Sequence, residues 1–256
     1  MILRVAMEIG GPFCFVAPAG RNLYSRLSRA HFVLLPPQGL PVKLNSDTRT
    51  QHEATMQNWA VFTGDIVRST DLGADALQDV FTALENAAQA IAQWPDSTTT
   101  FARFRGDGWQ MALPPVYALR GALVMRAAVR QTGKGRDTRI GVGVGQGQMQ
   151  GSDLASADGP AFLHSGRALD AISRGPRMVA PDGTVALRCA LPLADRIAQG
   201  WTPKQAQVAY ALLAPTPPTQ EALAQTLNRS RQMTQKQADA AGVIALLDSC
   251  DAYESA

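Results

Sequence analysis

Apolar and polar positions along the chain predict three strand segments. The apolar run 59–62 leads into Gly64-Asp65, which predicts a buried strand that surfaces at its end, where the chain turns toward a helix. Residues 101–113 alternate on both sides of Gly106-Asp107-Gly108, a pattern typical of a β-hairpin with an aspartate at its tip. In residues 139–147 apolar residues alternate with glycines, which predicts a strand that another backbone can approach closely.

Three further stretches carry apolar residues at helical spacing. They cover residues 77–93, residues 116–130 and a segment that begins at Gly159-Pro160. The order strand, helix, hairpin, helix, strand, helix predicts an α+β fold in which the helices lie on one face of the sheet. The apolar face of the third helix is expected to consist of Phe162, Leu163, Ala168, Leu169 and Ile172.

The C-terminal part predicts a small all-α domain. A linker helix is expected over 191–198, and Thr202-Pro203 begins the next helix as N-cap and first helical residue. Gln220, Ala224 and Asn228 have the spacing of a helix-turn-helix, in which Asn228 suits a left-handed turn.

The segment after Asn228 has the polar side chains of a DNA recognition helix. Their donors suit phosphates and base edges. Residues 195–256 nevertheless hold five basic and six acidic residues, so a trihelical module for protein contact is the alternative. The predicted DNA-binding residues are Arg229, Ser230, Arg231, Gln232, Gln235 and Lys236.

Composition narrows the class of protein. The chain has 256 residues, 46% of them hydrophobic, and a net charge of +3, which is too small to argue for nucleic-acid binding alone. Its three cysteines are far apart and lack C-x-x-C spacing. This indicates a reducing, cytoplasmic location and argues against a disulfide scaffold or a zinc site. Apolar runs also fall short of the roughly 18 residues expected of a membrane span.

Residues 1–55 have no regular pattern. Glycines and prolines interrupt their short apolar runs, whereas Met56 directly precedes the first predicted strand. We expect an N-terminal extension that is weakly folded, with Met56 as a plausible true start; a short hairpin that caps the sheet is the alternative. The predicted organisation is therefore 1–55 as an extension, 56–190 as the main domain and 191–256 as the helix-turn-helix domain.

Two aspartates are the main candidates for chemistry. Asp65 and Asp107 each follow a glycine, one at a strand end and one at a hairpin tip. Two carboxylates from neighbouring strands suit Mg²⁺ or Mn²⁺, and Mg²⁺ keeps places for substrate phosphates. The alternative is that both are turn residues, because Gly-Asp pairs are common in turns.

The motifs around these aspartates carry a family resemblance. GDIVRST (64–70), RGDGW (105–109) and RIGVGVGQG (139–147) resemble successive motifs of class III nucleotidyl cyclases. With ADGPAF (157–162) added, their order is similar to that of the SatD family, which joins a cyclase-like domain to a helix-turn-helix. The resemblance covers about Gln57 to the C-terminus. It implies a ferredoxin-like sheet, a nucleoside triphosphate ligand and DNA as a partner. A second copy of the chain is the further partner expected.

The resemblance assigns roles to individual residues. Asp65 and Asp107 match the two metal aspartates, and the carbonyl of Ile66 matches a further ligand. Arg167 matches an arginine that stabilises charge on the phosphates. The asparagine that orients the ribose is replaced by Leu163, on the predicted buried face, and neighbouring His164 is a candidate substitute. The implied catalytic residues are thus His164 and Arg167, and the substrate-binding residues are Arg103, Arg105, Gly106 and Ser156.

Two functions of different classes follow. One is a nucleotide- and Mg²⁺-binding sensor that controls a helix-turn-helix transcription regulator; the other is an active cyclase of altered base preference. The aspartate pair favours the enzyme, and the leucine in place of asparagine favours the sensor, because an alkyl side chain cannot donate a hydrogen bond. We favour the sensor.

Overall fold

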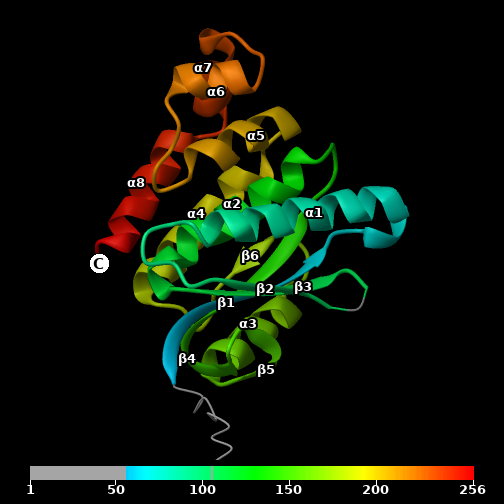
Figure 1. Ribbon diagram of the computed structural model, residues 1–256, viewed down its shortest axis with the longest axis vertical. Coiled ribbons are helices and arrows are strands. Elements are labelled where there is room, and N and C mark those ends of the chain that lie inside the picture. The colour runs from blue at the N-terminus through cyan, green and yellow to red at the C-terminus, as the bar shows by residue number, and fades with distance from the viewer. Residues whose placement is uncertain (1–55, 105) are drawn as a thin grey trace, which may run out of the picture. The chain divides into compact units, whose positions relative to one another are not determined.

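The computed structural model describes residues 56–104 and 106–256, so the expectations for residues 1–55 and for Arg105 lie outside the described part (Figure 1). The strands are β1 (Gln57–Ile66), β2 (Thr100–Arg103), β3 (Gly108–Leu113), β4 (Thr138–Gln150), β5 (Asp153–Asp158) and β6 (Met178–Val179). The helices are α1 (Ala74–Ile91), α2 (Ala118–Gln131), α3 (Pro160–Ala171), α4 (Val185–Gln199), α5 (Pro203–Leu212), α6 (Gln220–Thr226), α7 (Arg231–Ala240) and α8 (Val243–Glu254).

The strands form one mixed sheet in the order β2-β3-β1-β4-β5. Neighbours in this order are antiparallel, and β6 pairs with β4 in parallel. Strand β1 lies in the centre, where β3 and β4 satisfy both of its edges. The predicted succession of strand, helix, hairpin, helix and strand is therefore present, with β5 as an additional strand before α3.

Helices cover both faces of the sheet, so the prediction that they lie on one face is wrong. Phe62 and Ile66 of β1 pack toward α1 and α2, whereas Trp59 and Val61 pack toward the side of α3 and β5 (Figure 1). The physical reason is visible in β1 itself. Residues 59–62 are buried without alternation, as in a strand that is covered on both sides.

Glycines in β4 allow α3 to pack directly against the strand backbone. A Cβ added at Gly141 would lie 2.3 Å from the backbone nitrogen of Leu169, and one at Gly143 would lie 2.1 Å from the carbonyl oxygen of Ala161. The predicted close approach of another backbone to this strand is thereby confirmed. On this helix Leu163 is 51% exposed, so its predicted place on the buried face is wrong.

The C-terminal helices share the hydrophobic core of the sheet and α2. One continuous cluster of buried side chains includes Phe62 of β1, Trp201 before α5 and Cys250 of α8. The predicted boundary between residues 190 and 191 falls inside α4. Within the described part of the chain, no helix is long and apolar enough to cross a membrane.

Buried ion pairs fasten α2 to the helices that follow it. Arg126 is fully buried and donates to both carboxylate oxygens of Asp137, at 2.9 Å each, and to Asp195 of α4 at 2.5 Å. Arg120, also in α2, donates to Asp251 and Glu254 of α8, at 2.5 Å each. A buried guanidinium without such partners would be strongly destabilising, so these contacts fix the position of α4 and α8 on α2.

Candidate functional site

The structure brings Asp65 and Asp107 together at one end of the sheet. Asp65 of β1 lies opposite Gly108, the first residue of β3, and the backbone N–H of Ile66 donates to the carbonyl of Asp107 at 3.2 Å. The hydroxyl of Ser69, in the short turn after β1, donates to the Asp107 carboxylate at 2.5 Å. Two adjacent strands and the turn that follows β1 therefore position both carboxylates.

Arg139 is a member of this site that the sequence did not assign. It lies directly opposite Asp65 on β4, and its guanidinium donates to both Asp65 carboxylate oxygens, with Nε at 2.8 Å from Oδ1. These hydrogen bonds and the nearby charge of Asp107 raise the pKa of Arg139, which keeps it positively charged. Only the register of β1 on β4 makes Arg139 the neighbour of Asp65.

A buried indole fixes the backbone at Asp65. A Cβ at Gly64 would lie 2.4 Å from the Trp109 ring, so the indole occupies the place of a side chain. Its Nε1 donates to the Thr138 hydroxyl at 3.0 Å, and that hydroxyl donates to the carbonyl of Asp65 at 2.6 Å. Glycine before the aspartate is therefore required by packing as well as by the strand end.

The donor set fits Mg²⁺ if phosphates complete it. Among the described residues there is no group of three or more His, Cys, Asp or Glu side chains that could hold a metal alone. Two carboxylates are nevertheless enough for Mg²⁺, which commonly binds one or two of them together with substrate phosphates. Because Arg139 occupies the Asp65 carboxylate, a cation must displace it or share that carboxylate with it.

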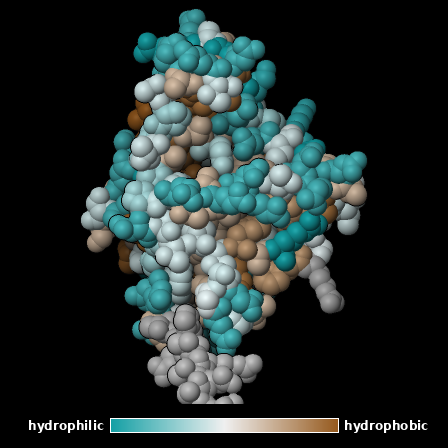
Figure 2. Space-filling view, viewed as in Figure 1, coloured by the Kyte–Doolittle hydropathy of each residue, from teal (hydrophilic) through white to brown (hydrophobic). Residues whose placement is uncertain are grey.

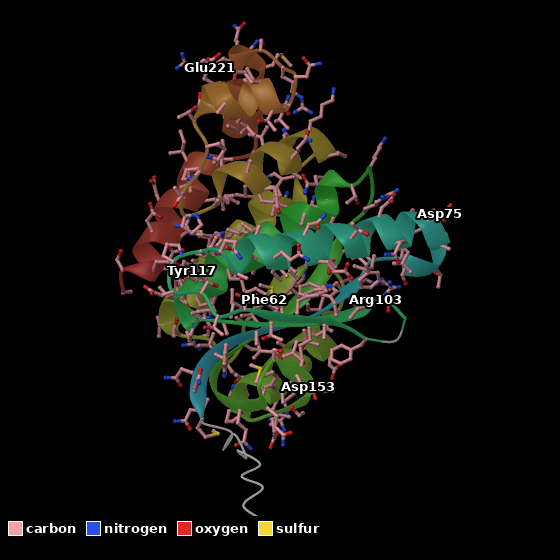
Figure 3. The ribbon with its side chains drawn as sticks, viewed as in Figure 1. Phe62, Asp75, Arg103, Tyr117, Asp153 and Glu221 are labelled. Atoms are coloured by element: carbon pink, nitrogen blue, oxygen red, sulfur yellow. The ribbon has the colours of Figure 1, made fainter. Side chains whose placement is uncertain are left out.

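Arg103 does not join the two aspartates. It lies opposite Trp109 in β2, on the face covered by α1, with its guanidinium carbon 3.6 Å from the centroid of the Phe81 ring (Figure 3). Its Nη1 also donates to Gln78 of α1 at 3.1 Å. Of the other hairpin candidates, Gly106 is exposed with a φ of 80°, as a tight turn requires.

Ser156 is hydrogen-bonded within the β4–β5 hairpin. Its hydroxyl accepts from the backbone N–H of Gln150 at 3.1 Å and donates to the carbonyl of Asp153 at 2.8 Å. Asp153 lies on the α3 side of the sheet (Figure 3). Strand β5 pairs with β4 at Gln148, nine positions beyond Arg139. Residues of β5 also contact β2, and Ala157 packs in the same small cluster as Ala102.

The two predicted catalytic residues lie on α3. Arg167 is exposed, and His164 is half-buried with an Nδ1 that has no hydrogen-bond partner in the described part of the chain. Next to His164, the hydroxyl of Ser165 bonds that of Thr63 at 2.8 Å, which joins the helix to β1 two residues before Asp65. The structure thus brings Asp65 and Asp107 to one end of the sheet, whereas Arg103 and Ser156 are bonded to residues outside that end.

Helices α6 and α7 form the candidate nucleic-acid interface. Asn228 has a φ of 49°, so it adopts the predicted left-handed turn, and Ser230 caps α7 by accepting from the N–H of Met233 at 3.2 Å. The surface around both helices is mainly hydrophilic (Figure 2). A shallow groove there is lined by Gln220, Arg231, Gln232, Gln235 and Lys236.

Two of the predicted DNA contacts are bonded within the protein. Arg229 is half-buried, and its Nη2 donates to Gln207 of α5 at 2.7 Å. Gln235 donates to Asp239, one turn later in α7, at 2.7 Å. Arg231, Gln232 and Lys236 are exposed on the first turns of α7.

Comparison with solved structures gives weak similarity. No protein-family model and no curated protein matches the chain. A solved structure of a bacterial light-regulated adenylyl cyclase is similar to 50% of this chain, at 15% sequence identity and a TM-score of 0.37. The similar part covers 44% of that protein, so the chain spans less than half of its length. Similarity at this level carries no weight for function.

Proposed function

We propose that this protein binds a Mg²⁺–nucleoside triphosphate at Asp65 and Asp107 and couples that binding to a DNA-binding helix-turn-helix formed by α6 and α7. The observation that carries the proposal is that Asp65 and Asp107 both lie at the joined ends of β1 and β3. The order β2-β3-β1-β4, with helices after β1 and β3, is also that of a ferredoxin-like sheet, as the resemblance to the SatD family implies.

The charged side chains at the site would bind the Mg²⁺ and the phosphates in different ways. Asp65 and Asp107, with the carbonyl of Ile66, would hold the Mg²⁺, which when bound supplies positive charge to the phosphate oxygens. Arg139 is 37% exposed, and its guanidinium can form paired hydrogen bonds with a phosphate as it does with the Asp65 carboxylate. Metal and nucleotide together would thus replace the Asp65–Arg139 pair with two new ion pairs.

A second copy of the chain would supply the remaining substrate contacts. Ser156 is hydrogen-bonded to Gln150 and Asp153, and Arg103 to Gln78, so neither is directed at the aspartates of its own chain. Sedimentation with and without Mg²⁺–nucleotide tests this homodimer, and a monomer under both conditions would exclude it.

A chain of buried contacts supports the coupling to α7. The backbone N–H of Val67, just after β1, donates to the carbonyl of Asp137 at 2.9 Å, and Arg130 donates to the Asp137 carboxylate at 2.8 Å. Arg130 also donates to the carbonyl of Trp201, whose Nε1 donates to the carbonyl of Ala241 at the C-terminal end of α7 at 2.9 Å. Arg139 is two residues from Asp137 in the sequence. A movement of Arg139 when nucleotide binds would therefore be passed through these contacts to α7.

Coupling requires that the nucleotide bind the two DNA-affinity states unequally. A gel-shift titration with and without Mg²⁺–nucleotide measures this difference. We expect the apparent DNA affinity to change when nucleotide is added. DNA binding that is indifferent to nucleotide would contradict the sensor, and no DNA binding at low salt would contradict the regulator as well.

The exposed residues of α7 allow the DNA-binding proposal to be tested one residue at a time. Loss of one phosphate contact, by Arg231→Gln or Lys236→Gln, should weaken binding to all sequences and reduce the salt slope by about one. Gln232→Ala should instead relax the preference among sites by about 1–3 kcal/mol, because glutamine reads base edges. Lys204→Gln, which removes an exposed positive charge on α5, is the control and should leave DNA binding unchanged.

The alternative function is an active nucleotidyl cyclase of altered base preference. The aspartate pair favours it, because Mg²⁺ or Mn²⁺ held by two carboxylates is what such chemistry requires. Incubation of the protein with Mn²⁺ and each nucleoside triphosphate, followed by mass spectrometry, distinguishes the two functions. A cyclic product that disappears in Asp107→Asn would establish the enzyme, and intact triphosphate would support the sensor.

A further inference from the structure

A second cavity, distinct from the aspartate site, lies between α4 and the segment that contains β6. It has a volume of about 710 Å³, within the range of about 300–1,000 Å³ typical of small-molecule sites. One wall is the face of α4 around Leu191, and the other is formed by Met178, Val179 and Ala180. The cavity is therefore lined mainly by apolar side chains.

The two walls are joined at one point by a buried carboxylate. Asp195 of α4 accepts from the backbone N–H groups of Arg177 and Met178, at 3.2 Å and 3.1 Å, and also from Arg126 and Gln199. These bonds satisfy Asp195, which is 3% exposed, so its charge is balanced inside the protein. The cavity is thus preformed, because the bonds of Asp195 fix the separation of its walls.

Two arginines give the cavity a positive rim. Arg188 and Arg196 lie eight positions apart on α4, roughly 12 Å along the helix axis. Both are exposed, and neither forms an ion pair with any carboxylate of residues 56–104 and 106–256. An apolar interior with cationic groups at its edge is complementary to an apolar body that carries an anionic head.

We propose that this cavity binds an amphipathic carboxylate of medium chain length. The alkyl chain lies along α4 between Leu191 and Val179, and the carboxylate is bound by Arg188 or Arg196 at the rim. The carboxylate is the favoured head because arginine binds it with paired, charge-assisted hydrogen bonds. This site is independent of the nucleotide site, so either proposal can fail while the other holds.

Decanoate is the probe, titrated below its micellar concentration into the full chain and followed by calorimetry. We expect saturable binding at one site, with affinity lowered about tenfold by Arg188→Gln or Arg196→Gln, as loss of a charge-assisted hydrogen bond predicts. Lys204→Gln removes one exposed positive charge on α5, away from the cavity, and should bind like wild type. Decanol, which has the same chain without the charge, should bind more weakly than decanoate.

A blocking variant tests where the chain lies. Val179→Trp fills the cavity from a half-buried position and should abolish binding, with circular dichroism to verify the fold. Leu193→Ala, which alters an exposed apolar residue of α4 outside the cavity, should have no effect. The proposal is overturned by a full chain that does not bind decanoate. It is also overturned by unchanged binding to a folded Val179→Trp or to both arginine variants.

Discussion

At the scale of single residues, the pair of Asp65 and Arg139 decides what the candidate site can bind. The carboxylate is 18% exposed and both of its oxygens accept from the guanidinium. A cation therefore competes with an arginine that is already in place, whereas a phosphate can take that arginine as a partner. Loss of this arginine should consequently change the affinity for metal alone and the affinity for metal with triphosphate in opposite directions.

Arg139→Gln should tighten the binding of Mg²⁺ alone and weaken the binding of Mg²⁺–triphosphate. The first effect follows from removal of a positive charge beside two carboxylates, and the second from loss of a phosphate ligand. Calorimetric titrations of each ligand measure both effects. Arg136→Gln, which breaks a surface pair with Asp79 at 3.4 Å, is the matched control. Weaker binding of both ligands by Arg139→Gln would show that the arginine only positions the aspartate.

Cys250 gives a residue-scale prediction for pH. Burial raises the pKa of its thiol from the ordinary 9.0 to about 12. The folded state therefore keeps the proton, while the unfolded thiol ionises near its ordinary pKa, so this contribution to the free energy of unfolding is present below about pH 9 and lost as pH rises toward 12. Between about pH 8.5 and 10.5, urea unfolding should show a steeper loss of stability for wild type than for Cys250→Ala. Equal slopes would contradict the burial of this thiol.

At the scale of elements, the contact of α3 with β4 depends on glycines that leave no room for a side chain. In Gly143→Ala the new methyl group would lie 2.1 Å from the carbonyl of Ala161 and 2.5 Å from the N–H of Ser165. Both atoms belong to the helix backbone, so they cannot move away by a side-chain rotation. The helix must therefore move away from the sheet, at a cost of about 1–3 kcal/mol or more.

Gly166→Ala is the control for this prediction. It lies on the same helix with open space at its Cβ, so alanine should stabilise α3 by about 0.5–1 kcal/mol. Urea unfolding of both variants measures the two opposite changes. A Gly143→Ala protein as stable as wild type would show that α3 does not rest on this strand.

Helices and strands with a strong hydrophobic period could be predicted from the sequence. Elements that depend on pairing with a strand distant in sequence could not. The hairpin, the two helices after β1 and β3, and the left-handed Asn228 follow from local pattern. Strand β5 has the sequence DLASAD, whose polar residues give little apolar alternation, and it exists because β4 offers an edge to pair with. Leu163 follows apolar spacing but faces outward, because the glycines of β4 already bring the opposite face of α3 to the sheet.

The residues of the candidate site likewise fall into those that could be predicted from the sequence and those that could not. Asp65 and Asp107 could be predicted because each lies in a motif at a strand end. The role of Arg139 depends on the register of two strands that are far apart in sequence. The contacts of Arg103 with Phe81 and Gln78 depend on which face of the sheet β2 presents to α1. No local pattern contains either piece of information.

At the scale of the whole described part, one hydrophobic core and the buried ion pairs of α2 join the sheet to the C-terminal helices. Asp195→Ala should therefore destabilise the sheet and α4 together, by about 3–5 kcal/mol, because it leaves Arg126 without one buried partner. The proposed sensor requires such a connection between its two parts. Its function nevertheless depends on a ligand at the aspartates.

The central claim is that Asp65 and Asp107 share one Mg²⁺–triphosphate site, and calorimetric titration of nucleotide in the presence of Mg²⁺ tests it most directly. Asp65→Asn and Asp107→Asn should each weaken binding by tenfold or more, at about 1.4 kcal/mol per tenfold change. Asp75→Asn, an exposed carboxylate at the start of α1, should bind like wild type. Wild-type affinity in both Asp65→Asn and Asp107→Asn would place the nucleotide elsewhere and contradict the account.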